Sequence, residues 1–158
     1  MRHSPLQLLR YSAPEISVAA NPVYDAAKPI EVGVDQLAVE SKIAQQKVPD
    51  NFPGHSWSVE MTITQTIKEG QNFPYTFRLS LVGLFLCRNG QLPIPDEERF
   101  VRINGSSMLY GAAREVVRSV TTLGPWGDIL LPTASFYDKE PPKGETSAAP
   151  KSDESERA

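Results

Sequence analysis

The chain has few of the side chains from which reactive or metal-binding sites are built. Among its 158 residues are one cysteine, Cys87, and two histidines, His3 and His55. A single cysteine excludes an intrachain disulfide and a zinc site made of several cysteines, and it favours a reducing compartment. One histidine lies near a terminus and the other in a Pro/Gly-rich loop, so we expect neither to serve as a base or ligand.

A net positive charge and long apolar runs are also missing. The net charge is −3, whereas a nucleic-acid or anionic-lipid surface needs a basic stripe. No stretch approaches the roughly 20 apolar residues of a membrane span, and the N-terminal residues lack the apolar run of a signal peptide. We therefore expect a cytoplasmic protein.

Catalytic and phosphate-binding motifs are absent as well. The chain has no Gly-rich phosphate loop. The acidic run Asp96-Glu97-Glu98 is typical of a first helical turn or a solvated face and does not indicate an acid/base pair. The sequence predicts a protein that is not an enzyme and that uses no cofactor and no metal.

The prolines, of which there are 14, stand mostly where the hydrophobic pattern breaks. From residue 138 onward the chain consists mainly of Pro, Lys, Glu, Ser and Ala, with no apolar residue larger than alanine. Such a segment does not bury enough surface to offset its ordering entropy. We expect one folded domain, residues 1–137, followed by a disordered polar tail, residues 138–158.

Four segments have strand character: residues 6–18, 30–45, 57–68 and 75–87. The alternation is clearest in 57–68, where apolar side chains point one way and polar ones the other, as in an antiparallel sheet with one wet face. Pro14 predicts an edge position or a bulge in the first strand. Gly83 predicts a bulge or a close backbone approach in the fourth.

One amphipathic helix is predicted over residues 106–123. Ser106 or Ser107 suits the N-cap, and Gly124 followed by Pro125 suits the end. We expect residues 100–103 to be extended and 104–107 to form a turn. The predicted fold is α+β, a four-stranded antiparallel sheet followed by one long helix, with a second helix short or missing.

The apolar stripe of this helix has two interpretations. It covers the chain's own sheet, or part of it contacts another subunit, because small residues allow close packing. The candidates for an oligomer interface are Ala112, Ala113, Val116 and Val120.

Aromatic and large apolar residues are the remaining candidates for a binding function. They supply much contact area at low entropy cost. The candidate polypeptide-binding residues are Trp57, Tyr75, Phe77, Phe85, Trp126 and Ile129. For Trp126, which lies between two glycines in a loop, filling the core edge below the helix is an equal alternative.

Three segments resemble the helical half of the SecB-type protein-export chaperones. They are FVRIN at 100–104, MLYGAARE at 108–115 and LGPWGDILLPTASF at 123–136. Residues 6–8, 15–18 and 82–85 resemble the strands of that family more loosely. The resemblance covers about residues 6–136.

This resemblance implies four antiparallel strands followed by helices, assembled as a homotetramer that is a dimer of dimers. It implies an ATP-independent cytosolic holdase, which binds unfolded precursor polypeptides in apolar grooves and keeps them competent for export and translocation. It also implies that an acidic sheet surface docks the SecA motor.

The chain departs from the family at that surface. Glu15 occupies one acidic position, but Ala19 and Arg78 stand where other acidic residues are expected. The polar segment after Phe136 also stops the family's apolar second helix. These departures weaken the expectation of a SecA partner, and they leave open a dedicated chaperone of one client, such as the antitoxin of a toxin–antitoxin module. An alternative of another class is a small-molecule-binding accessory domain with a pocket between sheet and helix.

Overall fold

The predicted order of four strands and one long helix is confirmed. A computed structural model describes residues 3–30, 36–88 and 92–137. Its elements are β1 (Leu6–Ala20), β2 (Leu37–Gln46), β3 (Gly54–Gln65), β4 (Tyr75–Arg88) and α1 (Ile94–Thr121). The predicted polar tail lies outside the described residues, as does part of the predicted second strand.

The four strands form one antiparallel sheet in the order β1-β4-β3-β2, so β1 and β2 are its edges. The pairing of β1 with β4 shifts register between Ser12 and Glu15. Pro14 lies inside that irregularity, because proline has no N–H to give to a ladder. The prediction for Pro14 offered an edge position or a bulge, and both occur.

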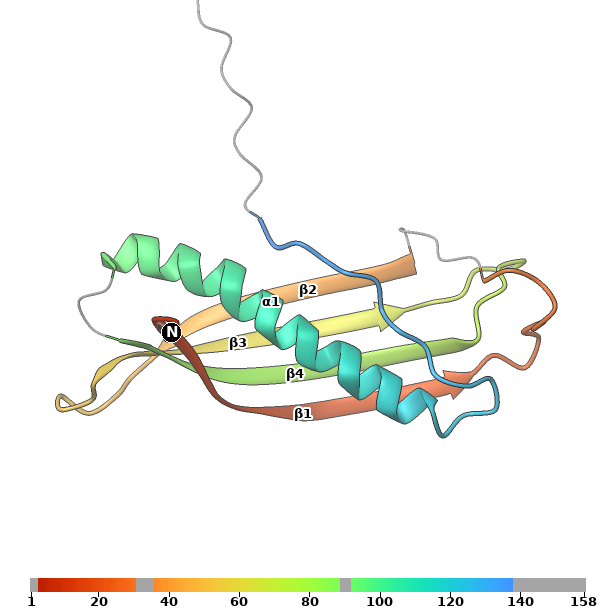
Figure 1. Ribbon diagram of the computed structural model, residues 1–158, viewed down its shortest axis with the longest axis horizontal. Helices are drawn as coiled ribbons and strands as arrows, with labels where there is room; N and C mark the ends of the chain where they lie inside the picture. Colours follow the sequence, from red (N-terminus) through yellow and green to blue (C-terminus); the bar gives the residue numbers. More distant parts are fainter. Residues whose placement is uncertain (1–2, 31–35, 89–91, 138–158) are drawn as a thin grey trace, which may run out of the picture.

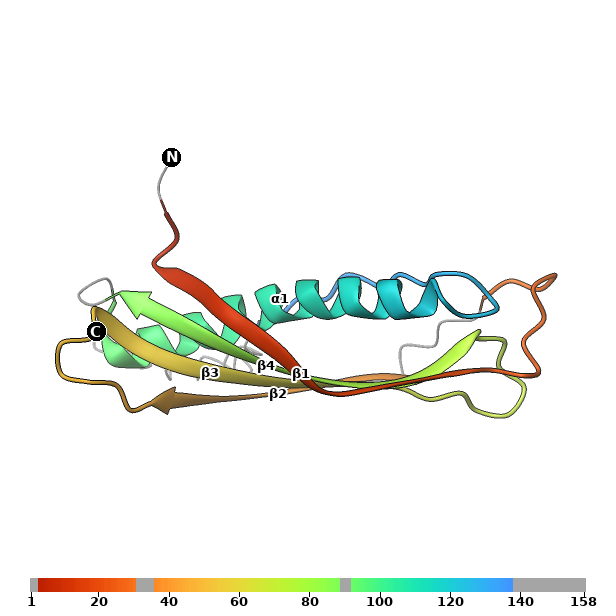
Figure 2. The same cartoon turned by 90° about the horizontal axis from the view of Figure 1, so that it is seen from below.

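The helix α1 runs diagonally across one face of the sheet, and the opposite face carries no helix in the described residues (Figures 1 and 2). The core lies between the two layers. Strand alternation places the larger core side chains on the face toward α1: Trp57, Val59, Met61, Ile63, Tyr75, Phe77, Leu79, Leu81 and Phe85.

The predicted start of the helix, and the extended segment before it, are wrong. The helix begins at Ile94, directly after Pro93, and includes both residues 100–103 and 104–107. Pro95 does not break it, because N–H groups in the first turn have no intrahelical acceptor to lose. Gly105 does not break it either, since packing on the sheet outweighs helix propensity.

Two glycines allow α1 to lie close to the sheet. A Cβ on Gly105 would stand 3.1 Å from Val59 Cγ2, and one on Gly83 would stand 2.8 Å from Phe85 Cε2 and 3.1 Å from Leu109 Cδ1. The predicted close approach at Gly83 is therefore confirmed, and no bulge occurs there in the regular register of β3 with β4.

Replacing Gly105 with leucine should destabilise the protein by roughly 1–3 kcal/mol, because the added side chain overpacks the helix–sheet contact. Gly111→Leu is the matched control on the same helix, since a Cβ there meets nothing within 4 Å. The control should be neutral or should stabilise by about 0.5–1 kcal/mol through helix propensity. Chemical denaturation measures both, and equal effects would contradict the close approach.

Candidate functional site

A buried carboxylate fixes the N-terminal end of α1 to the sheet. Trp57 Nε1 donates a hydrogen bond of 2.6 Å to Glu97 Oε1, and His55 Nδ1 lies 3.0 Å from both carboxylate oxygens. The acidic run lies in the first turn of α1, as predicted. Glu97, however, is buried and not solvated. His55, expected in a solvated loop, is instead its partner on β3.

The same cluster makes Cys87 a poor nucleophile. Burial, and secondly the neighbouring Glu97 carboxylate, raise the pKa of the Cys87 thiol to about 11. The reactive thiolate is therefore scarce at neutral pH. No group of three or more His, Cys, Asp or Glu side chains within residues 3–30, 36–88 and 92–137 is arranged to hold a metal ion. Across the described part of the chain, no helix has both the length and the apolar character needed to cross a bilayer.

After α1 the chain turns back and runs beside the helix toward β2 (Figure 1). We call residues 127–137 the strap. Tyr110 Oη donates to the Pro132 carbonyl at 2.8 Å, and Arg114 Nε donates to the Leu131 carbonyl at 2.9 Å. Burial raises the pKa of Tyr110, opposed in part by Arg114. Polar side chains of α1 thus hold the backbone of the strap.

The turn between α1 and the strap is built on the hydroxyl of Tyr75. This hydroxyl accepts from the backbone N–H of Trp126 at 3.0 Å and donates to the Gly127 carbonyl at 3.0 Å. Trp126 Nε1 donates to the Asn21 carbonyl, and its ring packs edge-to-face on Tyr24 at 5.5 Å. Trp126 is 38% exposed and joins the turn to residues 21–24, so it does not plug the core below the helix.

Most of the predicted polypeptide-binding residues lie in the core. Five of the six are covered by α1 or the strap and therefore have no exposed surface with which to bind a client: Trp57, Tyr75, Phe77, Phe85 and Ile129. They were selected because aromatic and large apolar side chains supply much contact area, but strand alternation directs those of β3 and β4 toward the core. Of the six candidates, only Trp126 keeps a substantial exposed area.

A small hollow opens between α1, the strap and β2. Its volume is about 140 Å³, and we call it the β2 hollow. Ser41 of β2 and the largely exposed Tyr137 stand at its mouth. Its lining residues are Ser41, Arg102, Ile103, Ser106, Phe136 and Tyr137. Sequence reasoning missed all of them as binding residues, because they share no periodic signal.

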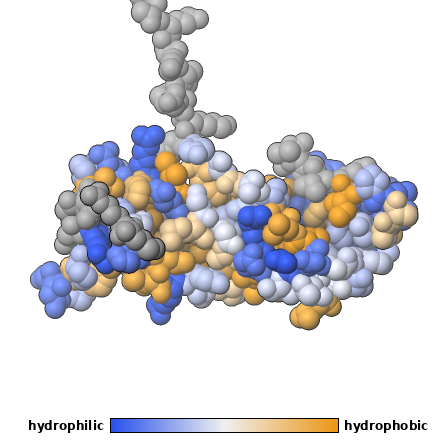
Figure 3. Space-filling model, viewed as in Figure 1, coloured by the Kyte–Doolittle hydropathy of each residue, from blue (hydrophilic) through white to orange (hydrophobic). Residues whose placement is uncertain are grey.

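The other side of α1 faces β1. Ala112, Val116 and Val120 are half-buried there, and Tyr11 and Ile16 on the edge strand are about half-exposed. Ala113, predicted with the first three as an interface residue, is fully buried against its own sheet, so it has no surface for a second subunit. In the view of the helix-bearing face, apolar surface forms several patches separated by polar residues (Figure 3).

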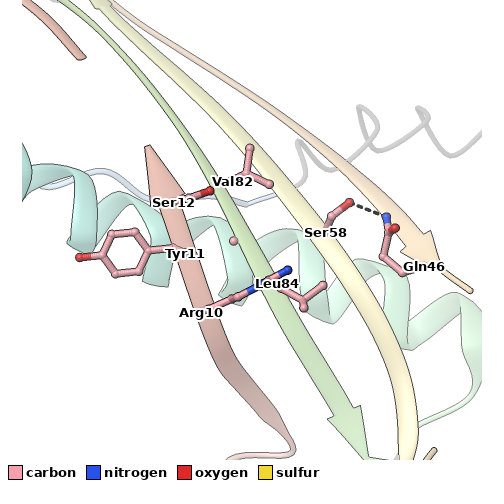
Figure 4. Close-up of a pocket in the computed structure, with 8 residues that line it drawn as sticks. Arg10, Tyr11, Ser12, Gln46, Ser58, Val82 and Leu84 are labelled. Atoms are coloured by element: carbon pink, nitrogen blue, oxygen red, sulfur yellow. Dashed lines mark hydrogen bonds between the residues drawn. The ribbon is translucent and has the colours of Figure 1, made fainter. Parts of the chain in front are cut away.

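The opposite face of the sheet is shallowly hollowed. A depression of about 540 Å³ is lined by Arg10 and Ser12 of β1, by Val82 and Leu84 of β4, and by Ser58 and Gln46, which share a hydrogen bond of 2.8 Å (Figure 4). On the same face Glu15 pairs with Arg78 at 3.0 Å. Its charge is therefore balanced. Between the sheet and the helix, where a ligand pocket was the alternative, the described residues form a packed apolar core with the β2 hollow at its margin.

Removing the Arg114 side-chain bond should loosen the strap. In Arg114→Met the Leu131 carbonyl loses its partner, and hydrogen–deuterium exchange of residues 127–137 should increase by several-fold. Arg118→Met is the control, because Arg118 pairs with Asp128 at 3.1 Å where both side chains are about half-exposed, and such pairs contribute little. Equal exchange in the two variants would show that Arg114 does not hold the strap.

The chain matches no protein-family model and no curated protein by sequence. By structure it is similar to a SecB-like chaperone of Mycobacterium tuberculosis, solved with a ChAD peptide from the HigA1 antitoxin, with 17% identity and a TM-score of 0.57 over 82% of this chain and 91% of that one. A protein of unknown function from Streptococcus agalactiae matches with 9% identity and a TM-score of 0.49 over 80% of this chain and 96% of that one. The first similarity, together with the sheet order and the single long helix, shows that this chain has the fold of a SecB-like chaperone.

Proposed function

We propose that this chain is an ATP-independent holdase that binds unfolded polypeptides along the edge of β2. The observation that carries the proposal is the open edge of β2 beside the β2 hollow. Within the described residues β2 pairs with β3 alone, so its outer backbone groups are available to another strand. An extended peptide that adds to a sheet edge gains main-chain hydrogen bonds, and neighbouring pockets take its alternate side chains.

The residues of β2 suit such a client. Val39 and Ile43 are half-buried and point toward α1, since their β3 partners Ile63 and Val59 are in the core. Beyond them are Ile103 of α1 and the exposed ring of Tyr137. Apolar burial contributes about 25 cal/mol per Å², so a few short contacts give weak binding that exchanges readily. Weak, repeated contacts fit a chaperone that releases its client without nucleotide.

The charges on the sheet face that α1 does not cover bear on which clients the chain binds. The Glu15–Arg78 pair replaces the acidic surface on which a SecA motor would dock. We therefore favour a dedicated client, with the antitoxin of a toxin–antitoxin module as the leading example, over general export and translocation with SecA. The structural neighbour holding an antitoxin peptide supports this choice. We place the activity in the cytoplasm.

Self-association is the second part of the proposal. Within the described residues β1 pairs with β4 alone, and a second copy packs on its outer edge and on the half-buried Ala112, Val116 and Val120 of α1. Pairs formed in this way then give the dimer of dimers expected from the resemblance.

The holding activity should depend on Tyr137. At a fixed ratio to a reduced, aggregating client and without ATP, the wild-type chain should suppress light scattering, and Tyr137→Asp should do so several-fold less well because a charge enters the mouth of the hollow. Val23→Asp is the matched control: Val23 is 80% exposed and Tyr137 79%, but Val23 lies outside the hollow. A wild-type chain that does not slow aggregation would sink the proposal.

The oligomer should depend on Val120. Val120→Glu places a charge in the proposed subunit contact and should shift the mass from light scattering toward the monomer at micromolar concentration. Val23→Glu is the control, because Val23 is 80% exposed and lies outside both β1 and α1. A wild-type chain that is strictly monomeric would contradict this part of the proposal.

A further inference from the structure

The depression on the sheet face that α1 does not cover has one charged residue in its lining, Arg10 of β1. Within the described residues Arg10 makes no ion pair, whereas Arg78 on the same face is paired with Glu15. Glu60, the one acidic residue of β3, has Lys42 opposite it on β2. The exposed guanidinium of Arg10 is therefore available to a carboxylate from elsewhere.

The lining changes in character from one edge of the sheet to the other (Figure 4). Gln46 of β2 and Ser58 of β3 are polar and share a hydrogen bond of 2.8 Å. Val82 and Leu84 of β4 come next, and both are half-buried. Arg10 lies beyond them on β1, opposite Leu84 in the ladder. A chain that crosses the depression from β2 to β1 thus meets polar, then apolar, then basic side chains.

This shape suits an extended segment better than a small molecule. A site for a small ligand encloses most of the ligand's surface. The depression instead lies open on one face of the sheet, and its lining comes from all four strands. The occupant that fits is a stretch of chain with small apolar residues followed by carboxylates.

The polar tail of this protein has that order of residues. Residues 138–147 are charged and polar, residues 148–150 are Ala-Ala-Pro, and residues 153–156 are Asp-Glu-Ser-Glu. Lys151 and Arg157 flank the acidic group without cancelling its charge. The tail thus presents, in sequence, the partners that the depression presents from β2 to β1.

The tail is also long enough to reach the depression. The described chain ends at Tyr137, which lines the β2 hollow together with Ser41 of β2 (Figure 1). The distance from Ser41 to Gln46 along the strand is about 17 Å, and three strand spacings from β2 to β1 add about 15 Å. Residues 138–152 extend to about 50 Å. Because β2 is an edge strand, the path between the two faces runs around its outer edge.

We propose that residues 153–156 bind Arg10 in this depression while residues 148–150 cover Val82 and Leu84, so that the tail crosses the outer edge of β2 and competes with clients there. Exposed ion pairs are individually weak. The tether offsets this weakness, because it gives the acidic group a local concentration that is roughly millimolar. The contact with Arg10 stands by itself, and only the competition rests on the proposed function.

Paramagnetic broadening in NMR spectra tests the contact in the full chain. A nitroxide is attached through Ser155→Cys, and the native Cys87 stays unlabelled at neutral pH because it is buried, with a pKa raised to about 11. The label should broaden the methyl signals of Val82 and Leu84 several-fold more than that of Thr76, which lies at the other end of β4 on the same face.

Charge reversal shows whether Arg10 is the partner. Arg10→Glu should abolish the broadening, because like charges then face each other. Lys68→Glu is the matched control and should keep it, since Lys68 is exposed and lies outside the depression. Adding Asp153→Lys, Glu154→Lys and Glu156→Lys to Arg10→Glu should restore the broadening. Broadening that survives Arg10→Glu, or that is equal at all three methyl-bearing residues in the wild-type sequence, would overturn the contact.

Two further outcomes separate the parts of the proposal. Broadening seen only between an isotope-labelled copy and a separate spin-labelled copy would place the tail on a second copy and overturn the intramolecular contact. In the aggregation assay Arg10→Glu should suppress light scattering at a several-fold lower concentration than the wild-type chain. Unchanged suppression would overturn the competition at β2. If Val82 and Leu84 are broadened but the wild-type chain does not slow aggregation, the holding function fails and the tail contact stands.

Discussion

The attachment of α1 to one face of the sheet is the constraint on which the rest of the structure depends. At one end the buried carboxylate of Glu97 accepts from Trp57 at 2.6 Å. At the other end the Tyr75 hydroxyl holds the turn that follows the helix. Between them, Gly83 and Gly105 let the two layers approach closely. The strap and the β2 hollow are then positioned by α1, since side chains of α1 hold the strap and line the hollow.

This arrangement separates the residues that build the scaffold from those that meet a partner. The large aromatics of β3 and β4 are used to hold α1 and are buried by it. On the side of the sheet that α1 covers, the accessible surface lies at the margins: the edges of β1 and β2, the half-buried side of α1, and the last residues of the strap. A protein that holds non-native chains by such margins makes many weak contacts, which suits rapid release without an energy source.

Prediction from sequence succeeded where a local hydrophobic pattern alone determines which side chains are buried. The alternation over residues 57–68 identified the inward face of β3, and Pro14 marked an irregular edge strand. It failed where contacts distant in sequence decide the outcome. From local sequence Gly105 is a helix breaker, but its contact with β3 keeps it within α1. His55 resembles a loop residue, but it lies on β3 and contacts Glu97. The β2 hollow combines single residues from β2, α1 and the strap, so no local pattern predicts it.

The central claim is that a client adds to the edge of β2 beside the β2 hollow. Its most direct test is hydrogen–deuterium exchange of the full chain with and without a reduced, unfolded client, in the absence of nucleotide. The account predicts protection of backbone amides in β2 and of residues 136–137, with little change in β4 at the centre of the sheet. Protection confined to the depression around Arg10 and Leu84 on the opposite face, or no protection anywhere, would contradict it.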